Sequence, residues 1–147
     1  MNIQDLKWLL LVDRRQGRLL CCSVTRHGRC HVEEYDTLQS DSSPKEHEVS
    51  SPIRKRESVT YGIEDRGDME EIKHFVRQLN EWLPGIFRQH SIEDLVVIAS
   101  SGVLGELRTR LRAELKQQCD LRKGAWIHLS IRELAEHPIV RELVGLD

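Results

Sequence analysis

The chain has 147 residues, enough for one domain with its own hydrophobic core, and we expect residues 1–147 to form a single domain. Its residues are 39% hydrophobic and 31% charged, and the formal net charge of −2 excludes nucleic-acid binding driven by an overall positive field, so such binding requires a local basic patch. No apolar run approaches the roughly 20 residues that span a bilayer, and Leu9–Val12 is too short for the core of a signal peptide, so we expect a cytoplasmic protein without membrane contact.

The first third of the chain is predicted to form an antiparallel meander. Leu6–Val12 is mostly apolar, which is typical of a central strand, and a polar turn separates it from a second strand at Arg18–Thr25. His27 and Gly28 indicate a two-residue hairpin turn, because both residue types tolerate a left-handed backbone. A third strand, Cys30–Tyr35, follows the turn.

Four cysteines raise the question of a disulfide or a metal site. The candidate zinc ligands are Cys21, Cys22, Cys30 and His31, whereas Cys119 lies far away in the sequence. The two-residue turn would place Cys22 opposite Glu33, about 10 Å from Cys30, whereas zinc requires each thiolate about 2.3 Å from the ion. We therefore expect free thiols, no metal and no cofactor, in keeping with a cytosolic protein.

Residues 37–68 differ in composition from the rest of the chain. Serines, two prolines and many charges replace the large apolar residues that would bury surface, so we predict a long mobile loop, with a brief edge strand at residues 59–63. Loops of this length inside a compact domain are often functional. The triplet Arg54, Lys55 and Arg56 is a candidate phosphate contact, and a solvated charge cluster is the alternative.

The second half of the chain alternates helical and strand patterns. Asp68 is the predicted N-cap of a helix that ends or kinks near Leu83, because Pro84 removes a backbone hydrogen bond. The unbroken apolar run Leu95–Ala99 indicates a strand covered on both faces. A helix should follow at once, with one apolar stripe formed by Leu104, Leu107, Leu111 and Leu115.

A last strand and a closing helix complete the predicted fold. The strand is expected within Leu121–Leu129, with its apolar part at Ala125–Ile127. Ser130 and Glu133 have capping-box spacing and should begin the helix, whose pattern Pro138 interrupts. The order β-β-β, long loop, α-β-α-β-α predicts an α/β fold with a mixed sheet and helices over it.

Two stretches around the predicted helix after Ala99 are candidate binding sites. Arg108, Arg112 and Lys116 recur at i, i+4 spacing as a basic row, which would suit RNA phosphates, with a solvated helix face as the alternative. Ser100, Ser101 and Gly102 precede the helix, where free backbone N–H groups can hold an anion, and simple capping by a serine is the alternative.

Asp13, Ser101 and His128 fall near the ends of three predicted strands, the edge where open α/β sheets bind ligands. A serine, a histidine and a carboxylate are the groups of a nucleophile–base site. No nucleophile elbow, phosphate loop or paired-carboxylate motif accompanies them.

Several segments together indicate a known family. They are Leu9–Asp13, Gly17–Leu20, Phe75–Asn80, Leu95–Ala99, Leu104–Arg108 and His128–Ser130. In this order and spacing the chain resembles the bacterial host-attachment protein family over nearly its whole length. The resemblance implies a fold like that of the middle domain of archaeal and eukaryotic peptide-release factors, whose long loop carries Gly-Gly-Gln. Residues 37–68 contain no Gly-Gly-Gln, so no residue is available here for peptide release by that mechanism.

Two main hypotheses for the function follow. The first is a non-enzymatic adaptor that binds ribosomal or other RNA, or a protein bound there, through the basic row. The second is a small hydrolase or nuclease that uses the carboxyl edge of the sheet. Protein–protein association through exposed Trp82 or Trp126 is a third, which the residues alone do not weigh.

Overall fold

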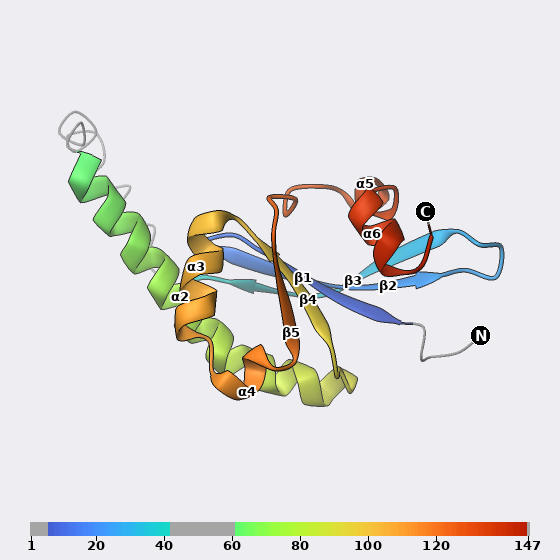
Figure 1. Ribbon diagram of the computed structural model, residues 1–147, viewed down its shortest axis with the longest axis horizontal. Coiled ribbons are helices and arrows are strands. Elements are labelled where there is room, and N and C mark those ends of the chain that lie inside the picture. Colours follow the sequence, from blue (N-terminus) through green and yellow to red (C-terminus); the bar gives the residue numbers. More distant parts are fainter. Residues whose placement is uncertain (1–5, 42–60, 147) are drawn as a thin grey trace.

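The computed structural model describes residues 6–41 and 61–146, the latter with side chains from residue 69 onward. A five-stranded mixed sheet in the order β3-β2-β1-β4-β5 forms its centre (Figure 1). The strands are β1 (Lys7–Val12), β2 (Gln16–Val24), β3 (Cys30–Gln39), β4 (Leu95–Ala99) and β5 (Cys119–Lys123). β1 pairs antiparallel with β2 and parallel with β4, β2 pairs antiparallel with β3, and β4 pairs parallel with β5. The predicted α/β fold with a mixed sheet is confirmed.

Helices cover both faces of the sheet. They are α2 (Tyr61–His90), α3 (Ser101–Arg110), α4 (Ala113–Lys116), α5 (Ile131–Ala135) and α6 (Pro138–Leu143). Figure 1 shows α2, α3 and α4 on one side and α5 and α6 on the other. The central strands are apolar throughout because side chains alternate between two cores: Leu10 joins the core under α2 and α3, and Leu9 and Leu11 join the core under α5 and α6.

The hairpin between β2 and β3 is one residue longer than predicted. The Thr25 N–H donates to the Arg29 carbonyl, the Gly28 N–H donates to the Thr25 carbonyl, and Gly28 has φ 79°. A type I turn followed by a left-handed glycine fits these contacts and shifts the register by one residue. Cys22 therefore lies opposite Val32 rather than Glu33.

The boundaries predicted for the loop at 37–68 are wrong at both ends. β3 runs to Gln39, with Tyr35 as an extra residue at a bulge where Leu19 pairs with Asp36 and Leu20 with Glu34. At the other end α2 begins at Tyr61, so residues 61–63 are helical and Asp68 lies inside the helix rather than at its N-cap. Residues 42–60, with Arg54, Lys55 and Arg56, lie outside the described residues.

Two further element boundaries also differ from the predictions. Of the two alternatives predicted near Leu83, an end of the helix is wrong: α2 continues through Pro84 to His90, and Ile86 and Phe87 still bury their side chains in the core beyond it. β5 lies at Cys119–Lys123, and the apolar residues Ala125–Ile127 belong to the following loop. The strand was predicted but placed too late in the chain, because β5 is a short edge strand with mixed polar residues, while Trp126 and Ile127 pack from the loop onto the second core.

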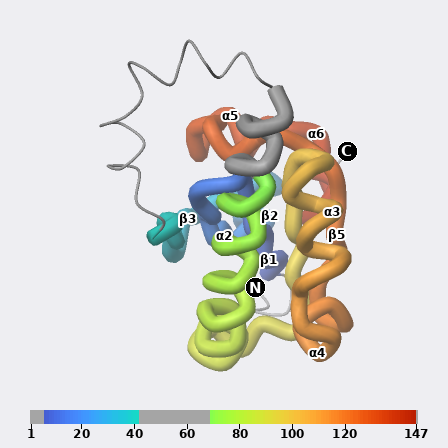
Figure 2. The backbone as a smooth tube through the Cα atoms, turned by 90° about the vertical axis from the view of Figure 1, so that its left-hand side faces the viewer, coloured from blue at the N-terminus to red at the C-terminus, as the bar shows by residue number. Residues whose placement is uncertain are grey.

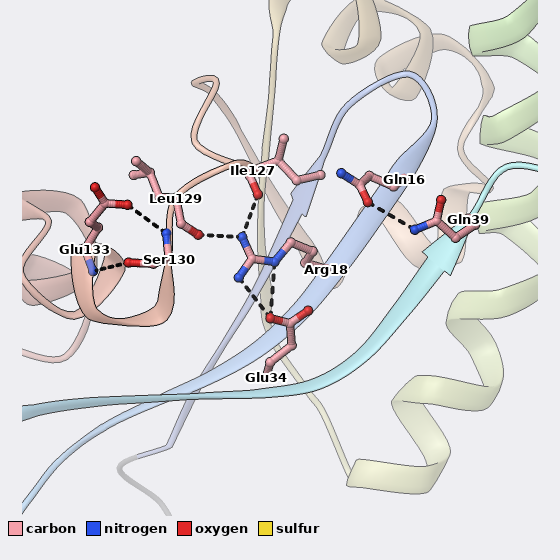
Figure 3. A network of polar contacts seen from close by, with 8 residues as sticks. All are labelled: Gln16, Arg18, Glu34, Gln39, Ile127, Leu129, Ser130 and Glu133. Carbon is pink, nitrogen blue, oxygen red and sulfur yellow. Dashed lines mark hydrogen bonds and ion pairs between the residues drawn. The ribbon is translucent and has the colours of Figure 1, made fainter.

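Arg18 connects that loop to the sheet. Its Nη1 donates to the carbonyls of Ile127 at 2.5 Å and Leu129 at 2.8 Å, and its Nη2 lies 2.9 Å from Glu34 Oε1 (Figure 3). Only 13% of the Arg18 side chain is exposed. One guanidinium thus satisfies two loop carbonyls that have no strand partner, and its charge is balanced by a carboxylate on the neighbouring strand.

The predicted capping box at Ser130 is confirmed. The Ser130 hydroxyl accepts from the Glu133 N–H, and Glu133 Oε1 accepts from the Ser130 N–H at 2.9 Å, which begins α5 (Figure 3). Pro138 then occupies the first turn of α6, where a missing N–H costs nothing. Pro138 therefore starts a second helix, with His137 as its N-cap.

The capping box gives the stability of the protein a pH dependence. Hydrogen bonds from the Ser130 backbone and side chain, with a smaller contribution from His128, hold the pKa of Glu133 below its ordinary value of 4.5. A carboxyl with a lowered pKa stabilises the fold above the unfolded-state pKa, and this stabilisation is lost as the pH falls through the folded-state pKa. Glu133→Gln keeps the acceptor oxygen but cannot titrate. We expect urea midpoints measured between about pH 3 and pH 6 to fall less steeply for E133Q than for the wild type. Parallel curves for the two proteins would contradict this.

Candidate nucleic-acid interface

The basic residues predicted at positions 108, 112 and 116 come from α3, the link after it and α4. α2 and α3 run side by side, with α4 at the end of α3 (Figure 2). Arg108, Arg110 and Arg112 are exposed and Lys116 is half-buried. We call these four residues the α3–α4 cationic surface.

The three predicted members do not form one continuous helical row. α3 ends at Arg110, Leu111 and Arg112 adopt extended backbone angles, and α4 starts at Ala113. Leu111 and Leu115 are nevertheless buried at 4% and 3% exposure, which explains why the leucine spacing predicted a single helix. The i, i+4 spacing of Arg108, Arg112 and Lys116 therefore does not follow one helix, because the break lies between the first two of them.

Asn80 of α2 holds this break in place. Its Nδ2 donates to the Arg110 carbonyl at 3.0 Å, and its Oδ1 accepts from the Arg112 N–H at 2.9 Å. The side chain thus satisfies the last carbonyl of one helix and the N–H just before the next. No sequence pattern pointed to Asn80, because its partners lie about 30 residues away.

Asn80→Ala is expected to lower the free energy of unfolding by about 1–2 kcal/mol, since it removes both hydrogen bonds at a partly exposed site. Asn80→Asp keeps the oxygen that accepts from Arg112 but loses the donor to Arg110. It should therefore lower the free energy of unfolding, but by less than N80A does. Urea denaturation measures both. Equal stability of N80A and the wild type would show that water replaces the asparagine without cost.

The side-chain contacts leave two of the four cations available to a ligand. Arg110 Nε pairs with Glu106 Oε1 at 2.7 Å, and Lys116 Nζ donates to the Arg108 carbonyl at 2.8 Å. Within the described ranges, the guanidinium groups of Arg108 and Arg112 make no hydrogen bond or ion pair. Lys116 thus connects α4 to α3, and Arg108 and Arg112 are the open contacts.

The second candidate site is the start of α3. Ser100 is the N-cap of α3, but its side chain makes no capping hydrogen bond, and Ser100, Ser101 and Gly102 are all exposed. The position of Ser100 as N-cap therefore agrees with the capping alternative, although no side-chain hydrogen bond accompanies it. A ligand at this helix end stays a prediction.

The structure also does not connect the three residues of the hydrolase hypothesis. Asp13 Oδ1 accepts from the N–H groups of Arg15 and Gln16, at 2.7 and 2.8 Å, so this carboxylate closes the turn after β1. Ser101 lies in the first turn of α3, and His128 is exposed in the loop after β5. Among the residues with described side chains, no hydrogen bond joins any two of the three.

Comparison with known proteins identifies the family. Residues 8–137 match the family described as "Protein required for attachment to host cells". The chain belongs to this host-attachment family. Its fold is similar to that in the crystal structure of the archaeal translation termination factor aRF1, with a TM-score of 0.50 and 12% sequence identity, over 97% of this chain and 38% of that chain. The chain therefore spans well under half the length of that factor. No curated protein matches the sequence significantly.

In this host-attachment family member the cysteines are divided between the two faces of the sheet. Cys22 and Cys30 face the core under α5 and α6, whereas Cys21 pairs with Trp8, whose ring packs on the opposite core. The register behind the predicted 10 Å separation of Cys22 from Cys30 was wrong by one residue. All four cysteines are free, and the part of the chain that the structure describes contains no cluster of three metal-binding side chains.

Burial makes the thiols poor nucleophiles. It raises the pKa of Cys21 and of Cys119 to about 11 and that of Cys22 to about 12. A thiol with a pKa of about 11 has roughly 100-fold less thiolate at pH 8 than a free cysteine, so we expect alkylation of Cys21 and Cys119 to be slowed about 100-fold in the native protein, and that of Cys22 to be slowed further. Mass spectrometry after timed iodoacetamide treatment, with and without urea, measures the ratio of the alkylation rates in the unfolded and the native protein. Equal rates in both conditions would contradict it.

Two remaining expectations concern the exposure of Trp82 and Trp126 and the presence of a membrane-spanning helix. Trp82 packs against the first core, and Trp126 packs against the second with its ring centroid 4.2 Å from that of His137, so both side chains are half-buried rather than exposed. No helix in residues 6–41 or 61–146 has the length and hydropathy needed to cross a membrane.

Proposed function

We propose that this member of the host-attachment family is a non-enzymatic, cytoplasmic adaptor that binds RNA, on the ribosome or associated with it, through the α3–α4 cationic surface. The observation that carries the proposal is the pair of exposed guanidinium groups of Arg108 and Arg112 that have no partner among the described side chains. Guanidinium groups bind phosphate oxygens through two parallel hydrogen bonds, which makes such a pair suited to a sugar–phosphate backbone.

The rigidity of the surface supports this function. The Asn80 hydrogen bonds and the Lys116 contact with the Arg108 carbonyl fix the path of the chain between α3 and α4. Arginines on a fixed backbone lose less entropy on binding than arginines on a loose loop. The distribution of charge also favours one-sided binding, because β3, at the opposite edge of the sheet, carries Glu33, Glu34 and Asp36.

The likeness in fold to a translation termination factor supports RNA of the translation apparatus as the partner. It does not extend to peptide release, because the chain has no Gly-Gly-Gln. In this proposal, the attachment role in the family description is exerted indirectly, through RNA, rather than by contact with the host.

The test is a comparison of two triple variants with the same change in charge. Arg108→Glu/Arg112→Glu/Lys116→Glu alters the α3–α4 cationic surface. Arg26→Glu/Arg29→Glu/Arg132→Glu reverses three exposed arginines elsewhere. We expect the first to abolish cosedimentation with ribosomes at low salt and to weaken binding of a short RNA at least tenfold, and the second to bind nearly as the wild type does.

The salt dependence adds an independent readout. If the phosphate contacts of Arg108 and Arg112 are lost, the slope of log K against log salt for single-stranded RNA should fall by about 1.4, since each contact contributes roughly 0.7. Equal weakening by both triple variants would indicate a general charge effect and contradict the proposed surface. Absence of RNA and ribosome binding by the wild type at low salt would contradict the function itself.

A further inference from the structure

β5 leaves one edge of the sheet open. It is the last strand in the sheet order, and β4 is its neighbour on the inner side. The Gln118 carbonyl accepts from the N–H of Leu95 in β4, and the Gly124 N–H donates to the carbonyl of Ala99 in β4. Successive residues of a strand direct their backbone groups to opposite sides, so the even-numbered residues of β5 bond to β4. The odd-numbered residues direct their N–H and carbonyl groups outward, and within residues 6–41 and 61–146 these groups make no hydrogen bond. They are Cys119, Leu121 and Lys123.

The charges of β5 are complementary to those of a second, antiparallel β5. Pairing centred on Leu121 places Asp120 of each copy opposite Arg122 of the other. The outward groups then meet in hydrogen-bonded pairs, Leu121 with its counterpart and Cys119 with Lys123. Opposite charges directly across two strands are stabilising and like charges are destabilising. A shift of the centre to residue 120 or 122 would place two like charges opposite each other, so one register satisfies both the backbone and the side chains.

Asp120 and Arg122 have atoms available for this contact. Their side chains are 56% and 40% exposed. Within one copy, Arg122 Nε and Nη2 donate to Asp120 Oδ2 at 3.0 and 2.8 Å. Arg122 Nη1 and Asp120 Oδ1 have no partner among the described residues. Two copies would therefore form a ring of four alternating charges, in which each side chain keeps its own partner and gains one across the interface.

The other edge of the sheet is not suited to such pairing. The middle of β3 carries Glu33, Glu34 and Asp36, so two antiparallel β3 strands would bring carboxylates opposite or next to one another. The bulge at Tyr35 also interrupts its ladder with β2. Bulges and like charges are the usual protection of an edge strand against association. The ladder between β4 and β5 continues without a shift, so the chain protects one edge and leaves the other complementary to itself.

We propose that two copies of this protein associate through β5, antiparallel about a two-fold axis at Leu121, and join their sheets into one. Strands of five residues bury little surface, so the association is weak and depends on concentration. α3 packs against β5 (Figure 2). The axis is perpendicular to the sheet, so the α3–α4 cationic surfaces of both copies lie on the same face of the joined sheet. The dimer does not require the proposed function, but for an RNA ligand it provides two binding surfaces in one assembly.

The test exchanges the charges of β5. Sedimentation velocity of the full chain, freed of nucleic acid and measured between about 1 and 300 µM, should show a shift from monomer to dimer. Asp120→Arg and Arg122→Asp each place like charges across the interface and should weaken dimerisation at least tenfold. An equimolar mixture of the two variants should dimerise again, because each chain then meets the opposite charge. The double variant D120R/R122D should dimerise as the wild type does.

Glu81→Arg and Arg88→Asp are the matched controls. They make the same changes in charge at exposed positions of α2, away from the edge of the sheet, and should leave dimerisation unchanged. A wild-type chain that stays monomeric at about 300 µM would overturn the proposal. A dimer that neither β5 variant weakens, or a mixture of the two that does not dimerise, would overturn it as well.

Amide hydrogen exchange of the wild type tests the interface without any substitution. In the dimer, exchange of the outward N–H groups of Cys119, Leu121 and Lys123 should slow as the concentration rises. The N–H groups of Asp120 and Arg122 bond to β4 and should be protected at every concentration. Outward groups that exchange equally fast in monomer and dimer would place the interface elsewhere and overturn the proposal. These measurements contain no RNA, so their failure leaves the proposed function intact.

Discussion

Replacing Arg18 with Met should lower the free energy of unfolding by about 3 kcal/mol, because the substitution leaves two loop carbonyls and one carboxylate without their donor. Met is close to Arg in length and can still pack its stem against the second core, so the loss is attributable to the hydrogen bonds. The contacts concerned are those to Ile127, Leu129 and Glu34. Because the loop joins β5 to α5, the loss of these Arg18 contacts should also loosen α5 and α6.

Two further variants separate the components of this effect. Arg18→Lys keeps the positive charge but replaces the planar fork by a single ammonium, so it should retain roughly half of the stabilisation. Glu34→Gln removes only the charge of the partner, whose side chain is 32% exposed, and should cost about 1 kcal/mol or less. Guanidinium denaturation measures all three variants. A loss below about 1 kcal/mol for R18M would mean that water replaces the guanidinium at the loop carbonyls.

The central strands could be predicted from the sequence because burial on both faces leaves an unmistakable pattern. Leu9–Val12 and Leu95–Ala99 are apolar without interruption, and both became core strands. The capping box at Ser130 was equally readable, since its two hydrogen bonds involve residues only three apart. Local interactions of this kind are encoded within a few residues, so sequence reasoning reaches them.

The features that were predicted wrongly depend on contacts between residues far apart in the sequence. The leucine spacing continues unchanged across the break between α3 and α4, and the contact that fixes the break comes from Asn80. The predicted position of β5 was too far along the chain, because the apolar pattern of Ala125–Ile127 is typical of a strand. In the structure these residues belong to a loop, to which Arg18 donates hydrogen bonds. Tertiary contacts overrode local propensity in both places.

At the candidate site, too, local patterns could be predicted from the sequence and contacts between distant segments could not. The basic residues of the α3–α4 cationic surface were identified from their types and spacing, and their role in binding stays a prediction. The open edge at β5 was not foreseen, because the strand was expected within Leu121–Leu129. Only the parallel pairing with β4 fixes its position and directs the backbone groups of its odd-numbered residues outward.

Gly124→Ala should destabilise the protein by about 1–3 kcal/mol, the usual cost of forcing a methyl group into a packed site. Gly124 follows β5 directly, and its N–H donates to the Ala99 carbonyl. A Cβ atom at this position would lie 2.6 Å from Ile98 Cγ2 and 3.0–3.1 Å from two atoms of the Trp126 ring. Ile98 is 2% exposed and its Cγ2 sits one bond from Cβ, so it cannot swing away, and the loop must shift instead.

Gly105→Ala provides the matched control, since it is the same substitution in an open position. A Cβ at Gly105 meets nothing within 4 Å, and the residue lies inside α3. There the methyl group should stabilise the protein by about 0.5–1 kcal/mol, because it reduces the backbone freedom of the unfolded chain. Thermal and urea unfolding of the two variants should therefore move in opposite directions from the wild type. If G124A is as stable as G105A, the close approach of β4 and the Trp126 loop at this glycine is not a constraint, and the route of the chain from β5 to α5 must tolerate displacement.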